Sequence, residues 1–149
     1  VLKKYGPAAV EDNRHHKVTK ALEDVTFINI AVTGVIANIT KSFSQSALGH
    51  MMYDGVRTFF TQEAKDALHG EIVAVALFTQ LYYNKLSEQK EQLKEFMRGM
   101  DMPLTLEELG VPCTEKNLKT LEDYLIDSPY VDPSPESLAL LHEAMKQMQ

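Results

Sequence analysis

The chain has 149 residues, 44% of them hydrophobic and 24% charged, and a formal net charge of -6 at pH 7. These values are typical of one soluble globular domain with a real core, and an acidic chain without a basic stripe is unlike a nucleic-acid-binding protein. Because the only cysteine is Cys113, no signal peptide is visible and the longest apolar run is residues 72–78, we predict a cytoplasmic protein without a disulfide or membrane span.

Helical periodicity extends over nearly the whole chain, and no run alternates strictly between apolar and polar residues. We therefore predict an all-α fold, a bundle of about seven helices in one domain of residues 1–149. Pro7 is expected to open a first helix that ends near residue 14. A second helix is predicted from residue 18 to Gly34. A second apolar stretch over residues 35–39 then leads into a polar loop over residues 40–44.

Two helices form the centre of the predicted bundle. The first is expected over residues 45–60, and the second, over residues 64–84, is apolar nearly all round, as buried central helices are. A capping-box pattern at Thr105–Glu108, ended by Gly110, predicts a further helical turn. The remaining predicted helices are amphipathic and cover residues 86–100, residues 114–127 and the segment that follows the cap Ser134-Pro135.

Two histidines lie among small and apolar residues at helical spacing: His50 in the first central helix and His69 in the first turn of the second. Two inward-facing imidazoles from neighbouring helices could hold one divalent metal, although catalytic zinc sites usually have three protein ligands. A histidine bonded to a carbonyl or carboxylate is the commoner state, and no His-x-x-x-His or His-Glu-x-x-His pattern is present. Spacing alone leaves a metal pair and two structural histidines both open.

Other candidate residues surround this pair. Tyr53, Asp54 and Arg57 share a helix face with His50, and Glu71 is better placed to order the neighbouring loop than to share ligands with His69. Elsewhere, we interpret Cys113 as a half-buried loop thiol rather than a nucleophile. We expect the remaining histidines, His15, His16 and His142, to lie at the surface. We assign no catalytic residue.

Two segments carry a family resemblance. Residues 47–55, which read Ala-Leu-Gly-His-Met-Met-Tyr-Asp-Gly, and residues 69–74, which read His-Gly-Glu-Ile-Val-Ala, together resemble the C-terminal helical domain of the iron-containing alcohol dehydrogenase superfamily, in its glycerol dehydrogenase branch. Residues 102–110 are similar to a further family segment, and the resemblance extends over essentially the whole chain. It implies a dehydroquinate synthase-like C-terminal helical domain that lacks the N-terminal nucleotide-binding α/β domain.

The resemblance implies a metal-dependent NAD(P) oxidoreductase acting on CH–OH groups, with a small alcohol or hydroxy acid as substrate. In that branch one aspartate and two histidines hold zinc or iron, and His50 and His69 match the histidines. The aspartate's segment would precede Val1. The metal would polarise the alcohol oxygen while hydride passes to NAD(P). Tyr53 stands where many relatives have another histidine, near the nicotinamide.

From this resemblance we expect the chain to be an inactive fragment of a two-domain enzyme. It should bind metal weakly or not at all because one ligand is missing, and it should self-associate through exposed apolar surface. Two alternatives remain open. Tyr53 could mark a branch that acts on hydroxy or keto acids without a bound metal, or the chain could be a free-standing helical binding module with structural histidines.

Overall fold

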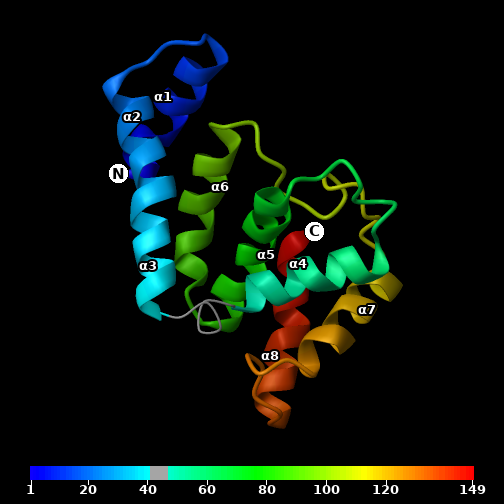
Figure 1. Cartoon of the computed structure of the whole chain (residues 1–149). Coiled ribbons are helices and arrows are strands. Elements are labelled where there is room, and N and C mark those ends of the chain that lie inside the picture. Colours follow the sequence, from blue (N-terminus) through cyan, green and yellow to red (C-terminus); the bar gives the residue numbers. More distant parts are fainter. Residues whose placement is uncertain (41–46) are drawn as a thin grey trace. The chain divides into compact units, whose positions relative to one another are not determined.

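The computed structural model describes residues 1–40 and 47–149, and every regular element in these ranges is a helix (Figure 1). The α-helices are α1 (Leu2–Arg14), α2 (Lys20–Phe27), α3 (Thr33–Thr40), α4 (Leu48–Phe59), α5 (His69–Tyr83), α6 (Lys90–Arg98), α7 (Glu115–Ile126) and α8 (Pro135–Met145). The π-helical residues Ile28–Val32 join α2 to α3, so the described chain has seven continuous α-helical segments. The predicted all-α fold class is confirmed.

The chain divides into two compact units, one of Val1–Gln45 with Glu95–Asp101 and the other of Ser46–Lys94 with Met102–Gln149. In the first unit α1 packs against α2. The prediction that a helix opens at Pro7 is wrong, because α1 begins at Leu2 and Pro7 lies inside it. Proline lacks the N–H of one helical hydrogen bond, but the turns on both sides of it remain helical.

The joined helix α2–α3 differs from its prediction in length. It passes through Gly34, where we expected it to end, and the predicted loop at residues 40–44 lies outside the described residues except for Thr40, the last residue of α3. The span Lys20–Ile39 is long and apolar enough to cross a membrane by length and composition alone, and none of its most apolar stretch is buried. We did not identify this span from the sequence, because polar residues interrupt its apolar ones.

Helix α5 is the centre of the second unit, as predicted. It packs against α4, α8 and the 3-10 turn Lys146–Met148, and Ile72, Val75 and Phe78 are buried along it. It begins at His69, five residues later than predicted. The residues before it, 60–68, are not helical, and we call them the turn segment.

Two glycines let α4 pack closely on both sides. A Cβ atom at Gly49 would lie 3.4 Å from Oε1 of Gln80 on α5, and the Gly49 N–H donates to that oxygen at 3.0 Å. A Cβ atom at Gly55 would lie 3.0 Å from the Tyr124 ring and 3.2 Å from Leu121, both on α7. Gly49 and Gly55 thus allow the close approach of α5 and α7.

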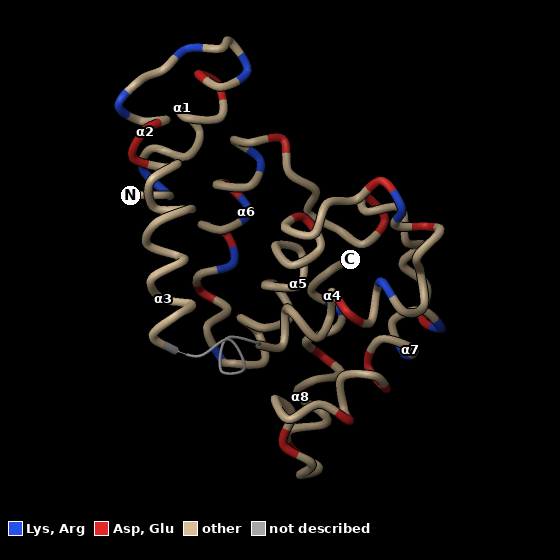
Figure 2. The backbone as a smooth tube through the Cα atoms, in the orientation of Figure 1, with Lys and Arg blue, Asp and Glu red and all other residues tan. Residues whose placement is uncertain are grey.

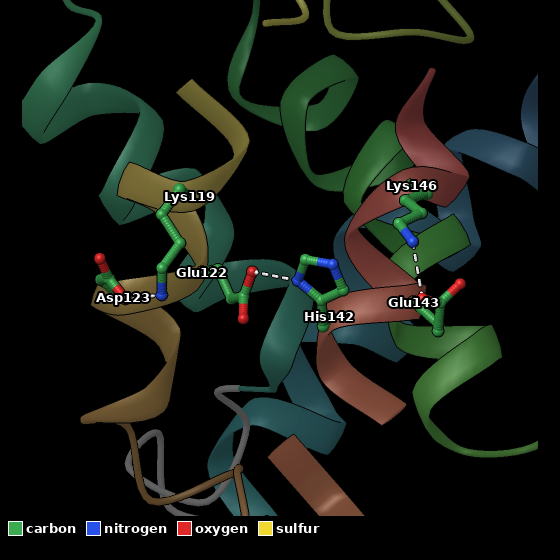
Figure 3. A network of polar contacts seen from close by, with 6 residues as sticks. All are labelled: Lys119, Glu122, Asp123, His142, Glu143 and Lys146. Carbon is green, nitrogen blue, oxygen red and sulfur yellow. Dashed lines mark hydrogen bonds and ion pairs between the residues drawn. The ribbon is translucent and has the colours of Figure 1, made fainter. Parts of the chain in front are cut away.

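The C-terminal helices follow their predictions within a few residues. Thr114 caps α7 and Ser134 caps α8. Between them, Nδ1 of His142 lies 3.0 Å from Oε2 of the buried Glu122, and exposed ion pairs flank this contact (Figure 3). The capping contact expected at Thr105–Glu108 is present, because the Glu108 N–H donates to Thr105 Oγ1 at 3.2 Å, but the segment forms turns rather than an α-helix.

Candidate metal centre

The structure brings His50, Tyr53 and His69 together where α4 meets the start of α5. The ring centroids of His50 and His69 are 5.8 Å apart, and those of Tyr53 and His69 are 4.1 Å apart with the planes tilted by 59°. These residues come from two segments of the chain that fold against each other through the Gly49 contact. The cluster is therefore a product of helix packing within one compact unit.

Both histidines are exposed, and our expectation that the imidazoles face inward is wrong. The buried face of α4 is formed by residues such as Leu48, Met52 and Val56. His50 and Tyr53 lie beside that face, at the edge of the packed helices. His69 is the first residue of α5, so its side chain lies at the end of the buried helix.

The separation of the histidines suits a shared metal ion. Since each zinc–nitrogen bond is about 2.0–2.1 Å long, two imidazoles on one tetrahedral ion have ring centres roughly 5–6 Å apart. The 5.8 Å between His50 and His69 agrees with this value. Among residues 1–40 and 47–149 no group of three or more His, Cys, Asp or Glu side chains is arranged to hold a metal ion.

The turn segment that leads into His69 is fixed by two side chains. Arg57 of α4 donates from Nη1 to the carbonyl of Ala64 at 2.8 Å and from Nη2 to the carbonyl of Ala67 at 2.6 Å. Glu71 accepts the N–H of Leu68 on Oε2 at 2.7 Å, which confirms our interpretation that it orders the neighbouring loop. Arg57 stands out on these helices, because α4 and α5 carry few charges (Figure 2).

The helical spacing correctly placed Arg57 on one face with His50 and Tyr53, but it did not predict these bonds to the turn segment. The sequence does indicate that the start of α5 needs support from elsewhere, because α5 follows Leu68, whose side chain has no oxygen to cap a helix. The guanidinium carbon also lies 5.5 Å from the centroid of the Tyr53 ring. Arg57 therefore contacts both the aromatic member of the cluster and the segment before His69.

The remaining candidates lie apart from this cluster. Cys113 is half-buried in a loop, as predicted, and the pKa of its thiol is raised by burial and then by the charge of Glu107. A raised pKa disfavours the thiolate, so the thiol is a poor nucleophile. His15 is exposed and lies 3.0 Å from the Glu11 carbonyl oxygen, and His142 is also exposed.

Comparison with known proteins relates the chain to oxidoreductases. No protein-family model matches it. It is 28% identical over 118 residues to the glycolaldehyde reductase of Halobacterium salinarum, an alignment that covers 77% of this chain and 30% of that protein. It is 30% identical over 114 residues to glycerol dehydrogenase 1 of Schizosaccharomyces pombe, with 74% of this chain and 24% of that protein covered.

Both relatives are named as enzymes that oxidise or reduce small hydroxylated compounds, one an aldehyde and the other an alcohol. The chain spans about a quarter to a third of the length of these curated relatives. The similarity therefore supports an alcohol-dehydrogenase-like relationship at low identity, over a part of such proteins.

Proposed function

We propose that this chain is the helical, metal-binding part of an NAD(P)-dependent oxidoreductase of the iron-containing alcohol dehydrogenase superfamily, in its glycerol dehydrogenase-like branch. His50 and His69 hold a divalent zinc or iron ion, and an aspartate from a segment outside this chain completes the ligand set. The observation that carries the proposal is the meeting of His50 and His69, 5.8 Å apart, on two adjoining helices. Their exposure leaves room for a third ligand and a substrate to approach.

A zinc or iron ion held by His50 and His69 would polarise the alcohol oxygen of a substrate, which would favour hydride transfer from the alcohol carbon to NAD(P)⁺ with loss of the hydroxyl proton. This chain would contribute by positioning the two histidines. Gly49 lets α4 approach α5, which sets the distance between His50 and His69. Tyr53 lies against the His69 ring and restricts its orientation from one side.

The two relatives favour a small alcohol, such as a polyol, and its aldehyde or ketone over a hydroxy or keto acid, because one is named a glycerol dehydrogenase and the other a glycolaldehyde reductase. Arg57 is the guanidinium beside Tyr53. One N–H of its Nη1 and one of its Nη2 donate to the Ala64 and Ala67 carbonyls.

The proposal is tested on the full-length protein that contains this chain, by elemental analysis and by oxidation of glycerol with NAD⁺ or NADP⁺. His50→Ala combined with His69→Ala should remove the bound zinc or iron and the activity. His15→Ala is the matched control, because its imidazole is exposed and far along the chain from the cluster, and it should keep both.

Unchanged metal content and activity in the double variant would refute the assignment and favour structural histidines. The chain of 149 residues gives a second test. With only two ligands it should bind Zn²⁺ weakly, and either histidine substitution should weaken binding further, by more than about tenfold, since even the loss of an outer-shell partner often costs that much. Tight Zn²⁺ binding that ignores both substitutions would contradict the proposal.

A further inference from the structure

Arg57 makes contacts that link Tyr53 on α4 to the turn segment that leads into His69. It is half-buried on α4, one turn after Tyr53 and two turns after His50. Its guanidinium reaches out of the helix to the turn segment, where it meets the carbonyl oxygens of Ala64 and Ala67. The same group lies 5.5 Å from the Tyr53 ring centroid.

These contacts require a guanidinium. Its nitrogens are held in a planar fork, so two of them can donate in parallel to two oxygens that are fixed relative to each other. The Ala67 N–H donates to the Ala64 carbonyl at 3.1 Å, which makes the two carbonyls part of one tight turn. A lysine ammonium is a compact point charge on a flexible stem and could not fix both oxygens in the same way.

The turn segment ends directly at His69. The Ala67 carbonyl is two residues before it, and the next N–H, that of Leu68, is bound by Glu71 from within α5. The start of α5 is thus held by an arginine from α4 and a glutamate from α5 itself. Because α5 lacks a Ser, Thr, Asp or Asn cap at Leu68, these side chains supply the order that a cap usually provides.

We propose that Arg57 is the positioning residue of the metal centre: by clamping the Ala64 and Ala67 carbonyls to α4, it sets His69 against Tyr53 and at binding distance from His50. The inference rests on the proposed function for the role of the histidines, but the clamp itself is a statement about geometry. It acts through the backbone of the turn segment, so Arg57 touches neither metal nor substrate.

The test compares Arg57→Ala and Arg57→Lys with the control Arg14→Ala, whose guanidinium forms exposed ion pairs in the other compact unit. Two quantities are measured on each folded chain by NMR: the nuclear Overhauser effect between the Tyr53 and His69 rings, and the affinity for Co²⁺ from titration of the histidine ring resonances. The rings are 4.1 Å apart in the wild type, within range of that effect.

Arg57→Ala should lose most of the ring-to-ring signal and bind Co²⁺ about 10–100-fold more weakly, as outer-shell substitutions do. Arg57→Lys should lie between Arg57→Ala and the wild type, and Arg14→Ala should match the wild type. Millimolar guanidinium ion should restore Co²⁺ affinity to Arg57→Ala. A general loss of folding would not respond in this way, because guanidinium ion does not stabilise folded proteins and can restore affinity only by filling the place of the missing side chain.

An Arg57→Ala chain that keeps both the ring-to-ring signal and the Co²⁺ affinity would overturn the clamp. If that variant does not fold, Arg57→Lys decides: an unchanged ring signal and affinity would overturn the clamp equally. Failure of the proposed function looks different. In that case His50→Ala and His69→Ala leave Co²⁺ binding unchanged, while the loss of the Tyr53–His69 signal in Arg57→Ala still supports the clamp.

Discussion

Replacing Gly110 with alanine should destabilise the chain strongly, because its backbone lies against the turn segment. Gly110 has a φ of +91°, and a Cβ atom built on it would lie 2.3 Å from the carbonyl oxygen of Glu63 and 3.2 Å from its carbonyl carbon. Both are backbone atoms, so no side-chain rotation can relieve the overlap. The alanine variant must move one segment away from the other.

The size of the effect follows from two costs. A left-handed backbone costs an alanine about 1–2 kcal/mol relative to glycine, and forcing an extra carbon into a packed site typically costs about 1–3 kcal/mol. We expect a loss of about 3 kcal/mol in the free energy of unfolding. For a chain of this length that corresponds to a fall in Tm of about 6–12 °C.

The assay is urea unfolding followed by far-ultraviolet circular dichroism. Gly70→Ala is the matched control, because nothing lies within 4 Å of its Cβ position and it sits in a helix; its stability should stay unchanged or rise by up to about 1 kcal/mol. Gly110→Asn separates the two costs. Asparagine tolerates positive φ better than alanine but still carries a Cβ atom, so it should remain destabilised.

A Gly110→Ala variant within about 0.5 kcal/mol of the wild type, the usual range for neutral surface changes, would refute the close approach. Recovery of full stability in Gly110→Asn would show that φ alone matters and that Glu63 does not approach as closely as described. Because Glu63 precedes Ala64, a shift here should also disturb the carbonyl that Arg57 binds.

The remaining predictions concern Cys113 and the contact between α7 and α8. Because burial and the Glu107 charge raise the pKa of the Cys113 thiol, its alkylation rate should reach half-maximum above the pH usual for a free cysteine, and Glu107→Gln should lower that midpoint; a midpoint at or below the usual value would contradict this. His142→Ala leaves the buried Glu122 without its partner and should cost about 1–3 kcal/mol of stability, whereas Glu143→Ala removes only an exposed ion pair and should cost less than about 1 kcal/mol. Equal losses in the two variants would show that the His142–Glu122 contact stabilises the chain no more than the exposed ion pair does.

The helices with local signals were predictable from sequence. For α7 and α8 a capping residue stands before an amphipathic run, and in each the cap oxygen accepts the N–H three residues later: Thr114 from Asn117 at 3.2 Å and Ser134 from Ser137 at 3.4 Å. Such contacts lie within one turn, so they are visible in the order of residues alone. The predicted boundaries of these helices were therefore close.

Boundaries that depend on distant contacts were not predictable. We extended α5 back to residue 64 because Ala64 to Leu68 reads as helix-compatible, yet the turn segment is held by Arg57 and approached by the backbone of Gly110. Gly110 is remote in the sequence from the turn segment, and Arg57 binds the segment through backbone carbonyls. Neither contact can be recognised from the order of residues. Tertiary contacts of this kind override weak local propensity.

The same distinction between local and distant contacts explains why the sequence predicted the helix positions of the histidines but not their exposure. Sequence periodicity correctly placed His50, Tyr53 and Arg57 on one stripe of α4, but it could not say whether that stripe faces the core. The Gly49 N–H bonds to Gln80, which turns the neighbouring buried face toward α5 and leaves the stripe at its edge. Imidazoles sealed inside the core would be closed to an external ligand. At the edge, His50 and His69 remain close to each other and exposed, as the proposed metal centre requires if a third ligand is to reach them.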